Sequence, residues 1–251
     1  MEQFVRHTGT VVPLRRTDVD TDQIIPARFC ASTSRSGHAA ALFADWRTEP
    51  GFVLDRPERA GASILVAGTD FGTGSSREYA VWALQDHGFR VVVAPRFGDI
   101  FRANSLMNGL LSVTLAPASV EYLWELTEAD PGARVTVDLE RGEVRCAGLV
   151  ERFTLDEDVR RRLLGGLDVI ADTLRFEADI GRYEGTRRAA LPVTRGRAPG
   201  TYEGPPVTYG GPPGTYGGPP GTYGGPPVAR GQALFAYDET PVFRGDTTVT
   251  S

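Results

Sequence analysis

Short apolar runs alternate with amphipathic stretches and turn signals from Phe4 to about Arg182. Residues 63–67 and 90–94 are apolar runs of the length of a buried strand, and residues 76–87 between them have the pattern of a helix. Strand, helix and strand in this order predict a parallel βαβ unit with a right-handed crossover. We therefore expect a mixed α/β domain.

The rest of this region predicts further helices and strands. One helix is expected to end at Asn108-Gly109, because glycine commonly follows the last helical turn. Pro117 is typical of a first helical turn, and a turn at Arg141-Gly142 is expected to join two antiparallel strands. The expected helices cover residues 100–107, 117–126, 156–164 and 169–177, and the expected strands cover residues 110–115, 135–139 and 144–147.

The last part of the chain has a different composition. Between residues 198 and 227 a Gly-Pro-Pro-x-Thr-Tyr-Gly unit is repeated, as in residues 211–217. Paired prolines favour extended backbone and glycines raise the entropy cost of ordering, so this segment is not expected to form a core. We predict one domain over residues 1–190 and a disordered low-complexity tail over residues 191–251, which is either dispensable or a tether or self-association segment.

Composition narrows the class of protein. The chain is 41% hydrophobic and 24% charged, and it lacks both an apolar run of membrane-spanning length and a signal pattern, so a cytoplasmic protein without a membrane partner is expected. A net charge of −5 without a basic stripe argues against nucleic acid as a partner. All 27 basic residues are arginine, which excludes phosphate-loop, Schiff-base and Ser-x-x-Lys chemistry.

Metal-ligating residues are few. Cys30 and Cys146 are too few for a disulfide framework, and alone they cannot hold an iron–sulfur cluster. His7, His38 and His87 have no metal-ligand spacing, so surface or packing roles are expected for them. The sequence therefore predicts no metal site on this chain.

The segment over residues 68–78 is the strongest candidate for chemistry. Its glycines let backbone NH groups approach a ligand, and the helix start that follows attracts anions, so it is a plausible carboxylate cradle. Ser75 and Glu78 also have the spacing of a capping box, which would explain both without catalysis. Arg77 favours the first interpretation, because a cation in the first helical turn opposes the macrodipole unless an anion faces it.

Three ordered motifs carry a family resemblance. They are residues 18–26 (Asp-Val-Asp-Thr-Asp-Gln-Ile-Ile-Pro), residues 71–78 (Phe-Gly-Thr-Gly-Ser-Ser-Arg-Glu), and residues 96–105 followed by Asn-Gly-Leu-Leu at 108–111. Together they resemble the small-subunit family of 3-isopropylmalate dehydratases in the aconitase superfamily. The resemblance covers about residues 1–188 and implies the swivelling β/β/α domain of that superfamily.

The resemblance also implies a function. Family members isomerise 2-isopropylmalate and 3-isopropylmalate through isopropylmaleate in leucine biosynthesis, in a heterodimer or a higher assembly of it. The implied [4Fe–4S] cluster belongs to the large subunit and not to this chain. Carried onto this sequence, Ser75 would be the general base, Arg77 would bind a substrate carboxylate and Ser76 would support it. Thr21 and Asp22 would bind substrate, and residues 27–31 would shape the discrimination between side chains.

Some alternatives stay open at this stage. Tyr79 stands where many family members have histidine, so any proton relay or carboxylate contact of that histidine is in doubt. The chain is therefore also compatible with a related hydro-lyase acting on homoaconitate or a methylmalate relative, or with a non-catalytic paralogue. Helix or turn capping is the alternative for Asp20 and Asp22, and helix termination is the alternative for three later polar residues, Asn104, Ser105 and Asn108.

Overall fold

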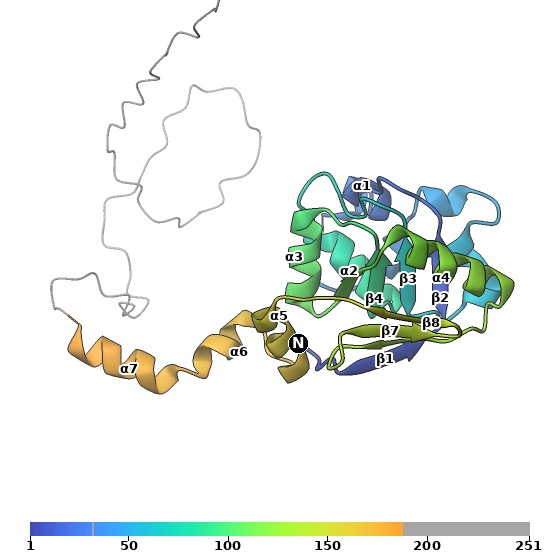
Figure 1. Cartoon of the computed structure of the whole chain (residues 1–251). Helices are drawn as coiled ribbons and strands as arrows, with labels where there is room; N and C mark the ends of the chain where they lie inside the picture. Colours follow the sequence, from blue (N-terminus) through green and yellow to red (C-terminus); the bar gives the residue numbers. More distant parts are fainter. Residues whose placement is uncertain (32, 188–251) are drawn as a thin grey trace, which may run out of the picture. The chain divides into compact units, whose positions relative to one another are not determined.

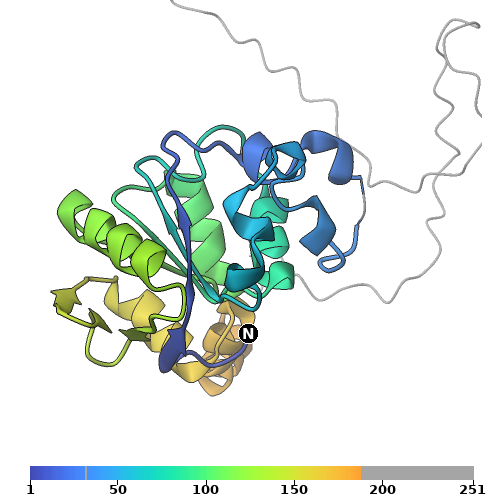
Figure 2. The same cartoon turned by 90° about the vertical axis from the view of Figure 1, so that its right-hand side faces the viewer.

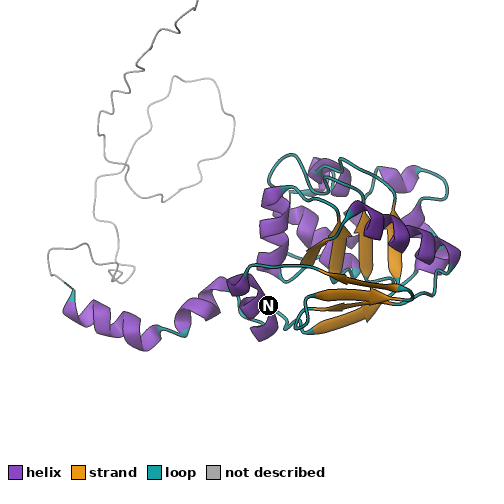
Figure 3. Ribbon diagram, in the orientation of Figure 1, coloured by secondary structure: helices purple, strands orange, loops and turns teal. Residues whose placement is uncertain are grey.

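The computed structural model describes residues 1–31 and 33–187, and within these residues the strands form two four-stranded sheets (Figures 1 and 3). The parallel sheet has the order β2 (Val11–Leu14), β3 (Ile64–Ala67), β4 (Val91–Ala94) and β5 (Leu111–Thr114). The antiparallel sheet has the order β1 (Arg6–Gly9), β6 (Val135–Asp138), β7 (Glu143–Cys146) and β8 (Leu149–Arg152). The predicted parallel pairing of the strands on either side of the first crossover is confirmed.

Both faces of the parallel sheet are covered. One face packs against α2 (Glu78–His87) in a core that includes Leu65, Val92 and Leu84. The other face packs against α4 (Pro117–Ala129) and the antiparallel sheet. Figure 2 shows α4, in yellow-green, to the left of the strands and the light-blue segment around residues 40–60 to their right. Because both faces are buried, the strands consist of continuous apolar runs, and this is why the sequence pattern identified them.

The remaining elements surround these layers. The other α-helices are α1 (Thr21–Ile24), α3 (Asp99–Asn108), α5 (Glu157–Gly165), α6 (Val169–Leu174) and α7 (Glu177–Thr186). Single 3-10 turns cover Ala27–Phe29, Ala39–Ala41, Trp46–Thr48, Val53–Asp55 and Pro57–Arg59. The predicted end of α3 is confirmed, since Gly109 follows it in the left-handed conformation at φ 84°.

Three predicted helices differ from the structure by more than one residue. The helix expected over residues 117–126 continues to Ala129 as α4. The helix expected from residue 76 begins at Glu78, with Arg77 in the extended N-cap position. The single helix expected over residues 169–177 is two helices, and the second begins after Phe176 with Glu177 and Asp179 in its first turn. Acidic side chains stabilise a helix N-terminus, which explains why a new helix begins there.

Several strands were not predicted. β1 and β2 are separated by Thr10 alone but lie in different sheets, so this stretch joins the two layers. Pro13 fits β2 because β2 is an edge strand. The predicted domain boundary at residues 190 and 191 and the predicted disordered tail lie outside the described residues. None of the helices in the described ranges has the length and apolar character needed to cross a membrane.

Candidate active site

The three sequence motifs meet at the carboxyl edge of the parallel sheet, where α/β folds commonly bind ligands. Residues 68–77 connect β3 to α2 at this edge. The loop is tied to the first motif by the bond from Gly72 N to Val19 O (2.7 Å) and by the bond from Thr21 N to Thr73 O (3.0 Å). It is tied to the third motif by the bond from Gly98 N to Phe71 O (2.9 Å). The loop therefore has a backbone partner on both sides.

Close packing under the loop requires glycine at two positions. Gly72 has φ +80°, and a Cβ there would lie 2.2 Å from Cγ of Phe101, whose side chain is buried. A Cβ on Gly98 would lie 2.3 Å from the carbonyl oxygen of Gly72. The absence of a side chain at these glycines allows the loop and the segment at the start of α3 to pack closely against each other, whether or not a ligand is bound.

The loop presents Ser75 and Ser76 to solvent, directly before α2. The Ser75 carbonyl oxygen accepts a hydrogen bond from Oγ1 of Thr21 at 2.9 Å. Thr21 is itself almost fully buried, so its hydroxyl anchors the loop to the interior of the domain. Contact between Thr21 and substrate stays a prediction.

Arg77 forms an ion pair with Asp22, and this contact joins the loop to α1. The bond from Arg77 holds the pKa of the Asp22 carboxyl below its usual range, and the same bond raises the pKa of Arg77. The Ala27 amide also donates to Asp22 Oδ1 at 3.2 Å. The Arg77 side chain as a whole is 22% exposed, and its Nη1 atom, which faces Asp22, is buried.

Capping is found at a different place from the predicted Ser75–Glu78 box. Asp20 and Gln23 form a reciprocal capping box on α1, with both bonds at 2.8 Å, so the capping role of Asp20 is confirmed. Ser75 is not the N-cap residue of α2, and the Arg77 side chain makes no cap bond there, so the predicted box is wrong. Glu78 instead accepts a bond from Nδ2 of Asn108 at 2.7 Å.

Of the residues for which helix termination was the alternative, Asn108 behaves in that way, whereas Ser105 bonds within α3. Ser105 is buried and its hydroxyl donates to the Phe101 carbonyl at 2.8 Å. The Asn108 side chain donates to the Asn104 carbonyl at 2.9 Å as well as to Glu78. Asn108 therefore links the end of α3 to the start of α2, beneath the loop that carries the serines.

Aromatic side chains line α2 next to this loop. The ring of Tyr79 lies 5.2 Å from that of His38 and 4.9 Å from that of Trp82. His38 is buried, and its ring nitrogen pairs with the Ser34 carbonyl at 2.9 Å, so the packing role predicted for this histidine is confirmed. Tyr79 thus belongs to a packed cluster, a role that only the tertiary structure shows.

The described residues do not provide a ligand set for an iron–sulfur cluster. Among them, no group of three or more histidine, cysteine or acidic side chains is placed to hold a metal ion. Cys30 and Cys146 pack against different core clusters. Burial raises the pKa of both thiols. The charge of Arg77 offsets part of this rise for Cys30, but the pKa of Cys30 remains raised. Since cluster ligands are several thiolates close together, these two cysteines do not fit the group.

Fold and loop together define a domain of the aconitase C-terminal type. The family model described as the aconitase C-terminal domain matches residues 1–118, and the model described as LeuD_N matches residues 121–157. A crystal structure of 3-isopropylmalate dehydratase from Methanocaldococcus jannaschii has a similar fold, with a TM-score of 0.53 and 24% identity over 70% of this chain and 98% of that one.

Sequence similarity specifies the family further. The 3-isopropylmalate dehydratase small subunit of Streptomyces griseus is 60% identical over 194 residues, which are 77% of this chain and 98% of that protein. The small subunit of Acidothermus cellulolyticus is also 60% identical, over 78% of this chain and 99% of that protein. The chain belongs to the family of 3-isopropylmalate dehydratase small subunits.

Proposed function

We propose that this chain is one half of a working 3-isopropylmalate dehydratase, which isomerises 2-isopropylmalate and 3-isopropylmalate through isopropylmaleate. The observation that carries the proposal is the exposed pair Ser75 and Ser76 beside an oriented arginine, Arg77, at the start of α2. The other half is a large subunit that holds the [4Fe–4S] cluster. The assembly works in the cytoplasm and uses neither membrane nor nucleic acid.

Ser75 is proposed as the general base. The carbon-bound proton beside a carboxylate is weakly acidic, so it leaves only to a strong base held close to it. The Ser75 alkoxide takes this proton and becomes a hydroxyl, while the electron pair of the C–H bond forms the double bond of isopropylmaleate. The positive end of α2 and the Arg77 guanidinium stabilise the alkoxide. Departure of the hydroxyl from the neighbouring carbon is the part of the reaction that we assign to the large subunit.

Arg77 is proposed to bind a substrate carboxylate, with Ser76 as its neighbour in the loop. Guanidinium and carboxylate match in charge and in geometry. Asp22 was predicted to bind substrate directly, but its own carboxylate repels a dicarboxylate and already pairs with Arg77. We therefore assign Asp22 to the site as a positioning residue that orients Arg77.

Asp22→Asn is expected to raise KM for isopropylmaleate by roughly 5- to 10-fold with little change in kcat, because one oriented charge is lost from Arg77. Asp22→Glu should keep KM close to the wild-type value, because the carboxylate that orients Arg77 is retained. The depressed pKa of Asp22 means that the ion pair is complete above the ordinary carboxyl pKa and is lost only as pH falls below it. The KM difference should therefore be the same from about pH 6 to about pH 9, and a difference that disappears within this range would contradict the assignment.

The proposed function is tested by anaerobic mixing of the full chain with a cluster-loaded large subunit from the same genome. Hydration of isopropylmaleate, followed by ultraviolet absorbance, is expected only when both chains are present. The related intermediates of homoaconitate and methylmalate metabolism serve as competing substrates. Faster conversion of one of these would assign the chain to a related hydro-lyase, and no conversion of any would indicate a non-catalytic paralogue.

A further inference from the structure

Large apolar side chains are exposed together on α6, α7 and the junction between them. Ten large apolar side chains are exposed within the described residues, and six of them lie on this segment. The six are between 38% and 72% exposed: Val169, Ile170, Leu174, Phe176, Ile180 and Tyr183. We call this set the C-terminal apolar surface. Spacings of three and four residues, as from Phe176 to Ile180 to Tyr183, place side chains on one face of a helix.

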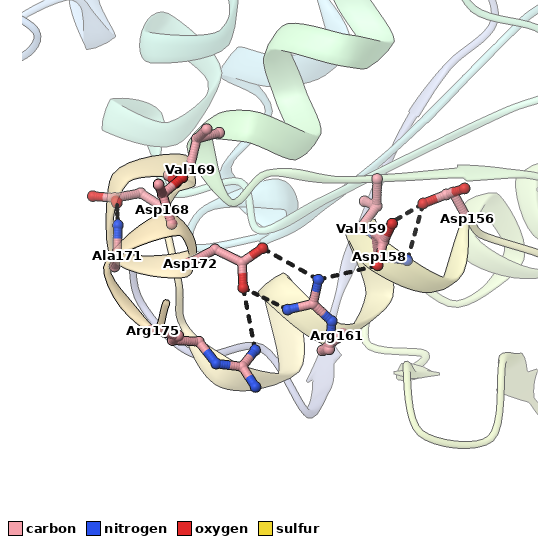
Figure 4. A network of polar contacts seen from close by, with 10 residues as sticks. Asp156, Asp158, Val159, Arg161, Asp168, Val169, Ala171, Asp172 and Arg175 are labelled. Atoms are coloured by element: carbon pink, nitrogen blue, oxygen red, sulfur yellow. Dashed lines mark hydrogen bonds and ion pairs between the residues drawn. The ribbon is translucent and has the colours of Figure 1, made fainter. Parts of the chain in front are cut away.

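A polar network holds α6 against α5 and so supports this surface (Figure 4). Asp172 of α6 accepts from both terminal nitrogens of Arg161 of α5, at 2.5 and 3.2 Å, and from Arg175 at 3.2 Å. Arg161 also donates to Asp158 at 3.0 Å. Asp168 caps α6 through the Ala171 amide at 2.7 Å. The position of α6 is thus determined by its polar side, while its apolar side chains stay exposed.

Two short helices with exposed apolar side chains need a partner. α6 has 6 residues and α7 has 10, and helices this short are marginal unless they pack against something. Large exposed apolar side chains that are concentrated on one segment point to an interaction site, because soluble proteins rarely expose large apolar patches without a function.

The match to a relative argues against the C-terminal segment as the partner of these helices. Any stretch covering 77% of this chain includes α6 and α7, so both helices lie in the part matched by the Streptomyces griseus protein. That protein is 98% covered by the match, so it has no counterpart of the long segment that follows in this chain. The Streptomyces griseus protein therefore has counterparts of α6 and α7 without a counterpart of this segment, which favours another chain as the partner.

A second copy of this chain offers too little area. Six side chains that are about half exposed present on the order of 500 Å² per chain, whereas a standard stable interface buries about 800 Å² per partner. A large subunit that already contacts this chain at the loop around Ser75 can use a smaller second contact area. The reason is that a second contact with a bound partner forms at a high effective concentration.

We infer that the C-terminal apolar surface is a second docking site for the large subunit, separate from the loop that carries Ser75 and Arg77. This inference rests on the proposed function, because it takes its partner from there. The matching surface of the large subunit is expected to be apolar and to accept the side chains of Ile170, Phe176 and Ile180. The α5–α6 network positions this surface, so the two contacts together select one orientation of the small subunit.

The test is the affinity of the full chain for the purified, cluster-loaded large subunit, measured by fluorescence anisotropy of the labelled chain. The double variant Ile170→Ser/Ile180→Ser is expected to raise Kd about 10-fold or more, because two apolar side chains lose their burial. At saturating large subunit its kcat should equal that of the wild type. The control is Val150→Ser on β8, which removes a side chain that is 64% exposed outside this surface and should leave Kd unchanged.

Each outcome separates the inference from the proposed function. An unchanged Kd in the double variant, with normal circular dichroism, would overturn the inference whether or not the complex is active. Normal wild-type binding without any isopropylmaleate hydration would count against the proposed function alone. A wild-type chain that dimerises in sedimentation velocity, while the double variant is monomeric with unchanged Kd, would assign the surface to a second copy. A double variant with unchanged Kd whose residues after 195 are cut faster than those of the wild type in limited proteolysis would assign the surface to the tail.

Discussion

Ser75→Ala is expected to lower kcat for isopropylmaleate hydration by about 10²- to 10⁴-fold at saturating large subunit, the usual contribution of a positioned acid–base group. The exposed position of Ser75 before α2 allows the hydroxyl to reach a substrate held by a partner chain, and alanine leaves no group that can take the proton. The measurement is the ultraviolet rate under anaerobic conditions, together with the Kd for the large subunit, which should not change.

Ser76→Ala is the matched control for this variant, because Ser76 is the adjacent exposed serine in the same loop. Its proposed role is to support carboxylate binding, so its effect should appear mainly in KM and should be much smaller than that of Ser75→Ala. A Ser75→Ala enzyme with near wild-type kcat would exclude Ser75 as the base. A Ser76→Ala enzyme with the larger loss of kcat would move the base to the neighbouring serine.

Gly72→Ala is expected to destabilise the domain by about 2–5 kcal/mol, as the combination of left-handed backbone strain and overpacking. The added Cβ would lie 2.2 Å from the Phe101 ring at φ +80°. That ring is buried and packs with Phe71 and Phe97, so it cannot move away cheaply. The measurement is the free energy of unfolding from urea denaturation of the full chain.

Gly51→Ala separates the two causes of this loss. Gly51 has φ +76°, but a Cβ there has nothing within 4 Å, so only the backbone strain of about 1–2 kcal/mol should be seen. Equal losses for the two variants would show that Phe101 accommodates the methyl group. The loop around Ser75 would then tolerate a wider spacing from α3 than the structure indicates.

Local patterns predicted the elements whose burial is nearly uniform. β3 and β4 are apolar along their whole length because both faces of the parallel sheet are covered, and Gly109 ends α3 because glycine readily adopts positive φ. β1 and β8 were missed because neither contains a continuous run of buried apolar residues. Strands of this kind are stabilised mainly by packing against neighbouring strands in the sheet, and the local sequence pattern does not show which strands are neighbours. β2 was missed although all four of its residues are buried, because Pro13 argues against a strand.

The sequence by itself determined the fold class, the family, and the loop in which Ser75, Ser76 and Arg77 lie, because each depends on residue types at short, fixed spacings. Only the tertiary structure decided how these residues are held. Thr21 bonds to the Ser75 carbonyl across 54 positions of the chain, and Asp22 pairs with Arg77 over a similar separation. Spacing within one segment allowed Ser75 and Glu78 to form a capping box, but the competing bond between Asn108 and Glu78 comes from another helix. Contacts of this kind depend on how the layers pack, and therefore no local pattern contains them.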